Sequence, residues 1–113
     1  MLDPVSNSLE KYLDVTASRQ KLVASNIANA DTPGYRTLDL DFQSEFQALL
    51  QGGSAMHPQE VTGIRIKNDG NSVNLDREAR LLSENSIRFS AVTNLLRSRF
   101  QILKSAINEG QGS

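Results

Sequence analysis

Residues 75–107 read LDREARLLSENSIRFSAVTNLLRSRFQILKSAI and carry the most regular hydrophobic pattern in the chain. Large apolar residues recur every seven positions, and a second series follows each of them four positions later. Spacings that alternate between four and three are the period of an α-helix with one buried stripe. The pattern predicts a helix about 50 Å long, at 1.5 Å per residue. Its predicted seam residues are Leu75, Leu82, Phe89, Leu96, Phe100, Leu103 and Ile107.

The residues around this stretch indicate where the helix begins and ends. Asn74 is a suitable N-cap and Gly110 is a suitable C-terminal stop. The apolar arc is wider than the seam, because Leu81, Leu95 and Ile102 lie about 100° around the helix from it. One partner helix would not cover such an arc. The pattern alone fits equally a helix in a bundle core and a helix that packs on several neighbours in an assembly.

A second long helix is expected from Leu2 to Ala30, with Asp3 as its N-cap and Pro4 in its first turn. Its apolar residues also recur at helical spacing, whereas Thr16 and Gln20 interrupt the apolar face midway. We interpret this polar break as a feature that fixes the register between packed helices. The predicted seam residues of this helix are Leu9, Leu13, Val23 and Ile27.

The composition predicts a thin core and excludes several classes of function. Hydrophobic residues make up 38% of the 113 residues, and the aromatic residues are four Phe and two Tyr. A compact independent fold would be marginal, so completion by copies or partners is expected. The net charge of −1 gives no argument for binding to nucleic acid or to an anionic membrane. The absence of cysteine excludes disulfides and thiolate zinc sites. No apolar run reaches the length of a membrane span, and the first residues do not resemble a cleavable signal peptide.

The first helix is predicted to end in the segment Asn29 to Tyr35. Pro33 cannot continue a helix, and Pro33-Gly34 suits the two central positions of a type II turn. Asn29 and Asp31 can form hydrogen bonds with nearby backbone groups. An ordinary loop would explain this composition equally well.

It is the run from Leu22 to Phe42, LVASNIANADTPGYRTLDLDF, that resembles a known family. It is similar to the N-terminal signature of the rod, hook and hook-associated axial proteins of the bacterial flagellum, and its DTPGY form looks like that of the proximal rod subunits. Residues 70–78, GNSVNLDRE, and residues 84–109 resemble the C-terminal helix of the same proteins. The resemblance implies that the assembly motif consists of Asn26, Ala28, Asn29, Asp31, Thr32, Pro33, Gly34, Tyr35, Asp39, Asp41 and Phe42.

The middle of the chain is expected to be extended and largely irregular. Leu38, Leu40 and Phe42 alternate with Asp39 and Asp41, which predicts a short extended segment whose aspartates are surface residues rather than metal ligands. A brief helix or turn is expected around residues 46–50, followed by a flexible connection over residues 51–72. Within that connection we expect a possible short strand at 64–66, a turn at 68–70 and an exposed loop histidine, His57.

Taken with the resemblance, these features predict an all-α chain whose terminal helices pair as an antiparallel, coiled-coil-like hairpin. Residues 1–34 would form the N-terminal helix and turn, 35–73 the middle segment and 74–113 the C-terminal helix. The resemblance implies a structural subunit of the flagellar rod that is exported without a cleavable signal peptide. The expected partners are copies of itself, other rod subunits, and adaptor, MS-ring or export-gate proteins at the rod base. No enzymatic activity, cofactor or metal is expected. The alternative from another class is a soluble helical adaptor or export chaperone that binds a partner helix.

Overall fold

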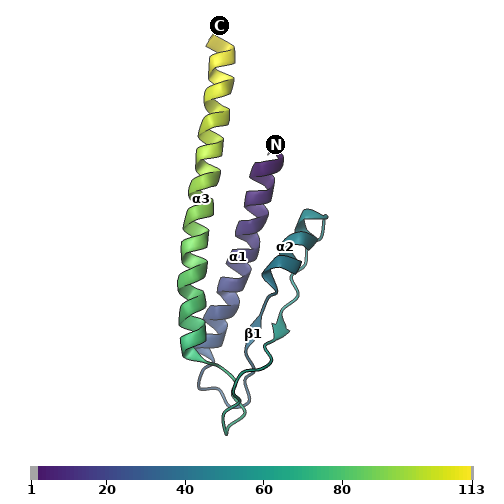
Figure 1. Cartoon of the computed structure of the whole chain (residues 1–113), viewed down its shortest axis with the longest axis vertical. Coiled ribbons are helices and arrows are strands. Elements are labelled where there is room, and N and C mark those ends of the chain that lie inside the picture. Colours follow the sequence, from purple (N-terminus) through teal and green to yellow (C-terminus); the bar gives the residue numbers. More distant parts are fainter. Residues whose placement is uncertain (1–2, 113) are drawn as a thin grey trace.

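Two long helices, α1 (Pro4–Ala28) and α3 (Leu75–Gly112), lie side by side and run in opposite directions (Figure 1). The computed structural model describes residues 3–112 and measures 71 × 26 × 18 Å. Because α3 is much longer than α1, its C-terminal part continues past the start of α1 (Figure 1). The predicted all-α class, with paired terminal helices and an irregular middle, is confirmed.

Local sequence signals set most of the helix ends. The Asp3 carboxylate caps α1 by accepting a hydrogen bond from the Ser6 amide at 2.7 Å, and Pro4 is the first helical residue. Leu2, the predicted start, lies outside the described residues. The Asn74 side chain caps α3 by accepting from the Arg77 amide at 3.0 Å. The predicted stop at Gly110 is wrong, because α3 continues to Gly112; glycine in a helix costs only about 1 kcal/mol and does not force an end.

The face that α3 presents to α1 lies mostly to one side of the predicted seam and shares Leu96 with it. It contains the buried residues Glu78, Leu81 and Asn85, continued by the half-buried Leu96 and Arg99. A single partner helix covers only part of a wide apolar arc, and α1 covers the part that contains the residues just named.

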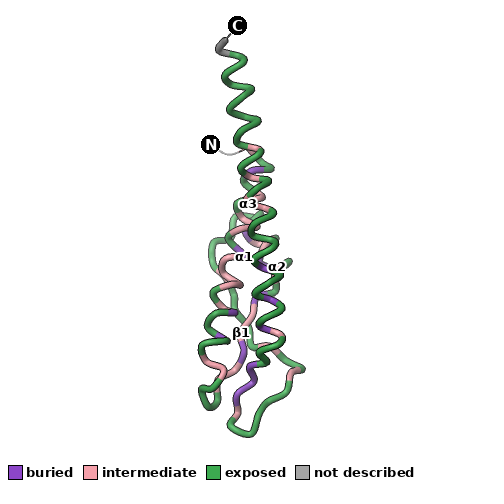
Figure 2. Tube along the Cα trace, turned by 90° about the vertical axis from the view of Figure 1, so that its left-hand side faces the viewer, coloured by how far each residue is buried: buried purple, intermediate pink, exposed green. Residues whose placement is uncertain are grey.

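Most of the predicted seam is therefore uncovered in the single chain. Val23 is buried, and Leu9, Leu13 and Leu96 are half-buried. The exposed members are Ile27, Leu75, Leu82, Phe89, Phe100, Leu103 and Ile107. Residues 100–110 of α3 are all exposed, and Figure 2 shows them as a continuous exposed stretch. The seam stays a prediction for an assembled state.

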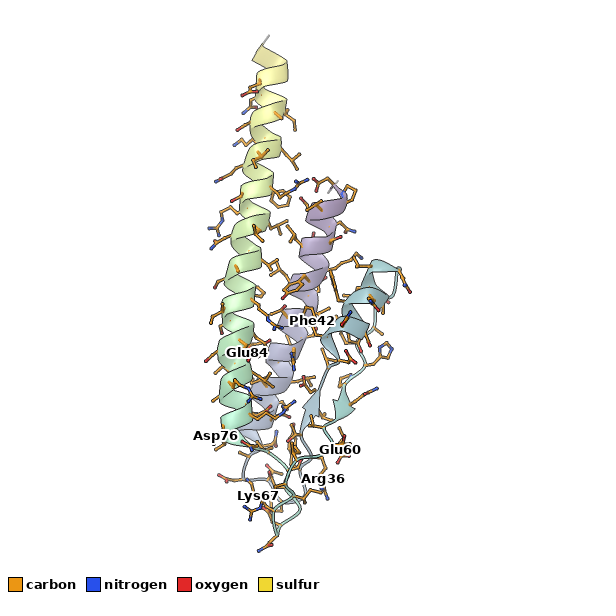
Figure 3. The ribbon with its side chains drawn as sticks, in the orientation of Figure 1. Arg36, Phe42, Glu60, Lys67, Asp76 and Glu84 are labelled. Atoms are coloured by element: carbon orange, nitrogen blue, oxygen red, sulfur yellow. The ribbon has the colours of Figure 1, made fainter. Side chains whose placement is uncertain are left out.

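The middle segment, residues 35–73, folds back along α1 as an arm (Figure 1). It contains β1 (Leu38–Asp39), α2 (Phe42–Leu50) and β2 (Gln59–Glu60). The two short strands pair antiparallel, with Leu38 opposite Glu60. The ring of Tyr12 in α1 meets those of Phe42 and Phe46 edge-on, at centroid distances of 4.7 and 5.8 Å. Figure 3 shows Phe42 where α2 approaches α1.

The structure corrects three expectations for this segment. Phe42 begins α2 instead of ending the extended segment, because the Asp41 side chain caps the helix at Ser44 N, 3.3 Å away. The strand after α2 lies at 59–60 rather than 64–66, since these residues are the ones that reach the edge of β1. Residues 71 and 72 are buried rather than flexible, because they form hydrogen bonds with the end of α1 and the start of the arm.

Both predicted turns are present. The Tyr35 amide donates to the Thr32 carbonyl at 3.2 Å, and Gly34 has a φ of +78°, as the third position of a type II turn requires. At the second turn, the Gly70 amide donates to the Lys67 carbonyl at 2.9 Å. The chain thus leaves α1 through a defined turn and returns to α3 through another.

Candidate functional site

The side chain of Asn26 joins α1, the arm and α3 in one buried site. Its amide nitrogen donates to the Leu38 carbonyl at 2.9 Å and to Glu78 Oε1 at 2.5 Å. Its oxygen accepts from the Leu38 amide at 3.2 Å and from the Tyr35 hydroxyl at 3.0 Å. A primary amide has two donors and two acceptor positions, so Asn26 is fully satisfied. The sequence places it here because position 26 lies on the buried side of α1.

Asp39 forms the second centre of the site and binds two arginines. Arg19 of α1 reaches it with two hydrogen bonds, Nε to Oδ1 at 2.8 Å and a terminal nitrogen to Oδ2 at 2.9 Å. Arg77 of α3 donates to the same Oδ2 at 2.6 Å and to Glu78 Oε2 at 2.7 Å. The four charged groups therefore form a row in the order Arg19, Asp39, Arg77 and Glu78. Each charge lies beside one of opposite sign, which offsets the cost of removing these groups largely from water. The expectation that Asp39 is a surface residue is wrong, because the arm lays it between the two helices.

The environment keeps Asp39 and Arg77 ionised. Burial raises the pKa of Asp39, but the hydrogen bond from Arg19, the Leu40 amide and Arg77 together lower that pKa below its usual value. Burial lowers the pKa of Arg77, but hydrogen bonds to Glu78 and Asp39 raise it above its usual value. Asp39 and Arg77 therefore stay charged at neutral pH and hold each other in place.

Asn71 fixes the turn at the end of α1. Its amide nitrogen donates to the carbonyl of Asn29 at 2.9 Å and to that of Thr32 at 2.8 Å. Its oxygen accepts from the Val73 amide at 2.8 Å. The side chain is completely buried. The segment that enters α3 is thus attached to the segment that leaves α1.

Further hydrogen bonds join the same two segments. The Gly34 amide donates to the Asp69 carbonyl at 2.9 Å, and the Thr37 amide donates to the Ser72 hydroxyl at 2.8 Å. Gly70 lies so close to the turn that a Cβ atom on it would stand 3.3 Å from the Cα of Gly34. We call the whole site the clamp, and it consists of Arg19, Asn26, Tyr35, Thr37, Asp39, Asn71, Ser72, Arg77 and Glu78.

The structure brings some of the predicted motif residues into the clamp and leaves others outside it. Asn26, Tyr35 and Asp39 belong to it, while Asn29 and Thr32 contribute backbone carbonyls. Asp41 caps α2 and Phe42 packs on α1. The exposed members are Ala28, Asp31, Thr32, Pro33, Gly34 and Asp41. The motif is therefore one half of a bipartite site.

Sequence reasoning missed the other part of the clamp, which comprises Arg19, Thr37, Asn71, Ser72, Arg77 and Glu78. By sequence alone, Glu78 looks like an acidic residue in the first turn of the last helix, and Arg19 looks like an ordinary charged helix residue. The available signal was the second resembling stretch, residues 70–78, which contains four of the six missed residues.

The clamp is built to hold position rather than to react. Its polar atoms are engaged by one another and by the backbone. Within residues 3–112, no cluster of three or more His, Asp or Glu residues is placed to hold a metal ion. None of the helices in that range has an apolar run long enough to cross a membrane. Such a network fixes the arm at one angle to the helix pair.

Comparison with known proteins gives consistent matches. The pattern of the family described as "Flagella basal body rod protein" matches residues 13–36. Flagellar basal body rod protein FlgB of Escherichia coli strain K12 is 32% identical over 136 residues, covering 93% of this chain and 99% of the relative. FlgB of Salmonella typhimurium is 33% identical over 139 residues, covering 99% of each. FlgB of Yersinia enterocolitica is 28% identical over 137 residues, covering 97% and 100%. These alignments are longer than the chain, so the relatives have residues at positions where this chain has none.

Proposed function

The chain belongs to the FlgB family of flagellar basal body rod proteins, and we propose that it is a structural subunit of the proximal rod whose paired helices form the inner layer. The observation that carries this proposal is the uncovered apolar surface of α3. Phe100 is 44% exposed and Ile107 is 60% exposed, and both follow Arg99, which pairs with Asp3 at the start of α1. A subunit with this much unpaired apolar surface completes its core by assembly.

The clamp supports a mechanical role in such a rod. A drive shaft transmits torque only if each subunit resists bending between its parts. Arg19, Asn26 and Arg77 tie the arm to both helices through charged and fully satisfied hydrogen bonds. Helix pair and arm would therefore move as one body. The subunits would together surround part of the export channel.

The proposed neighbours follow from the position of the proximal rod. They are copies of this chain, other rod subunits, and the adaptor, MS-ring or export-gate proteins at the rod base. The subunit would lie in the part of the rod that crosses the periplasm, after export through the flagellar type III apparatus. The exposed stripe of α3 and the outer side of the arm are the surfaces available for these contacts.

Deletion of the gene tests this function. We expect the deletion strain to be non-motile and to lack rods, and we expect the restored chain to purify with the basal body. Complete rods in the deletion strain would contradict the proposal. Recovery of the chain only as a discrete cytoplasmic heterodimer would favour the adaptor or chaperone alternative instead.

A further inference from the structure

The two-stranded sheet of the arm has one closed edge and one open edge. At the edge of β1, the Asn26 amide occupies both backbone groups of Leu38, donating to its carbonyl at 2.9 Å and accepting from its N–H at 3.2 Å. The side chain of Asn26 thus takes the place of a neighbouring strand. Among the described elements, β2 contacts only β1, and Figure 1 shows it on the side of β1 away from α1. The outer edge of β2 is therefore open.

The backbone groups of Glu60 point out of this open edge. In an antiparallel pair, directly opposite residues alternate between pairs that exchange hydrogen bonds and pairs that do not. Leu38 lies opposite Glu60 and turns both of its backbone groups toward Asn26. One position further along, the Val61 amide donates to the Thr37 carbonyl at 2.9 Å. Leu38 and Glu60 are thus a pair without hydrogen bonds, so the N–H and C=O of Glu60 point away from β1.

The open edge is short and carries a negative charge. Pro58 has no N–H group, so the row of backbone donors ends there and only about three residues of an extended segment can add. The carboxylate of Glu60 is exposed and forms no ion pair within residues 3–112, and Figure 3 shows Glu60 on the outer side of the arm. This edge fits a short extended segment with a cation opposite Glu60.

The chain itself contains such a segment, residues 64–66, with the sequence Ile-Arg-Ile. Two β-branched residues around an arginine are a composition typical of strands. In the single chain, however, the segment is not a strand, and its backbone forms no hydrogen bond with any described residue. Ile66 is 54% exposed, and the exposed Arg65 has no ion-pair partner in the described part of the chain. The strand predicted at 64–66 therefore lacks a partner within one chain.

We propose that residues 64–66 of one copy add to the open edge of β2 in a second copy. This inference rests on the proposed function and names a contact on the arm, not on the terminal helices. Copies in a rod share one orientation, so the added segment runs parallel to β2. Both segments belong to the same arm, so the two copies are offset along it by at most about 16 Å, at 3.3 Å per residue.

The charges set the register of this pairing. Arg65 of one copy lies opposite Glu60 of the other, so that two exposed and unpaired charges of opposite sign meet. In a parallel pair with this register, the Glu60 N–H donates to the Ile64 carbonyl, and the Ile66 N–H donates to the Glu60 carbonyl. Ile64 then lies opposite Gln59, on the other face of the sheet. The edge and the added segment are different surfaces, so the contact repeats from copy to copy.

Cysteine cross-linking tests the contact, because the chain contains no cysteine. Glu60→Cys and Arg65→Cys are produced together in cells that lack the natural gene, and isolated basal bodies are then oxidised. We expect a species of twice the chain mass from this pair and from Gln59→Cys with Ile64→Cys. Gln59→Cys with Arg65→Cys is the matched control, since its thiols lie on opposite faces of the sheet. This control pair, and each variant produced alone, should give no such species.

Three results would overturn the proposal. The first is the absence of the double-mass species from both matching pairs. The second is an equal amount of that species from the control pair. The third is a cross-link from Glu60→Cys to a different rod protein in place of a second copy. In each case, basal bodies that contain the unmodified chain leave the proposed function intact, whereas complete rods that lack it would contradict the proposed function itself.

Discussion

Asn26 joins three elements through a single amide, so its replacement measures how firmly the clamp holds the arm. Asn26→Ala leaves the two backbone groups of Leu38 and one oxygen of Glu78 without this partner. Unsatisfied buried groups cost roughly 1–3 kcal/mol each, partly recovered by water. We expect the free energy of unfolding to fall by about 3 kcal/mol, measured by urea unfolding followed by circular dichroism.

The matched control for this variant is Asn7→Ala. Asn7 is the same residue type in the same helix, but it is exposed. Its replacement should change the free energy of unfolding by no more than about 0.5 kcal/mol. Equal effects of the two variants would show that Asn26 contributes no more than a surface asparagine.

Asp39 predicts how the stability depends on pH. Its pKa in the folded chain lies below the unfolded value of about 3.9, so its contribution is fully present above that value and is lost as the pH falls through the folded pKa. Asp39→Asn should be less stable at pH 7 by on the order of 3 kcal/mol, because Arg19 and Arg77 lose their shared partner. It should also lose less stability than the natural chain between about pH 5 and pH 2.

Urea unfolding at several pH values tests this expectation. Asp14→Asn, at an exposed position of α1, should keep the slope of the natural chain. If the curves of Asp39→Asn and the natural chain run parallel, Asp39 does not stabilise the fold through its charge.

Residue-level prediction succeeded where the chemistry is local. Asp3 with Pro4, Asn74, and Pro33 with Gly34 each act on residues within one turn, and their roles could be predicted from the sequence. The partners of Asp39 could not, because Arg19 lies 20 residues before it and Arg77 lies 38 residues after it. An aspartate between leucines looks exposed until the fold brings arginines to it.

At the scale of elements, the turn after α1 is tested by Gly34→Val. A Cβ atom at Gly34 meets nothing within 4 Å, so the cost comes from the positive φ and amounts to roughly 1–3 kcal/mol. We expect normal export but reduced incorporation into the rod, because the strained turn changes the angle of the arm. The measurement is the ratio of incorporated to exported chain.

Gly63→Val controls for general destabilisation. Gly63 has a φ of +76° and equally open surroundings, but it lies in the loop after β2, outside the clamp. It should carry a similar strain and still be incorporated. Equal loss of incorporation in both variants would show that the turn after α1 only connects two segments and does not set the angle of the arm. Loss of export in Gly34→Val would instead indicate that the motif is recognised as an export signal.

Two leucines of α3 separate folding from assembly. Leu96 is half-buried against α1, whereas Leu103 is exposed beyond Arg99. Leu96→Asp should destabilise the free chain by roughly 2–4 kcal/mol, because it buries a charge. Leu103→Asp should leave the unfolding curve nearly unchanged and abolish motility. Ser98→Asp, at an exposed position, is the control. If cells that carry Leu103→Asp are motile, Leu103 does not belong to the assembly seam.

The helices themselves were predictable because their periodic patterns are long, but the orientation of α3 was not. Its apolar arc is wider than one partner can cover, so the pattern leaves several faces possible. The face chosen contains the polar residues Glu78 and Asn85, which a rule based on apolar residues assigns to solvent. The hydrogen bond between Asn26 of α1 and Glu78 of α3, rather than the apolar content of α3, therefore decides which face of α3 turns toward α1 near its start.

At the scale of the whole molecule, the chain is one elongated unit with a stiff end and an unpaired end. The clamp lies where the turns meet the helices. The C-terminal part of α3, which extends past the start of α1, lies at the opposite end (Figure 1). We propose that the divisions at 34/35 and 73/74 mark the limits of the arm rather than those of independent domains, since Asn71 joins the arm to the end of α1 and Asp39 joins it to Arg77 of α3. The low share of hydrophobic residues predicted the incomplete core, because the chain has too few apolar residues to cover both sides of α3.

The central claim is that the clamp fixes the arm on the chain's own helix pair and that this unit enters the rod unchanged. A cryo-electron microscopy map of the assembled basal body, with this chain traced in it, tests the claim most directly. We predict that Asp39 lies between Arg19 and Arg77 of the same subunit, and that Asn26 contacts Leu38 of its own arm. An arm that has left its own helices and packs on those of a neighbouring subunit would contradict the claim.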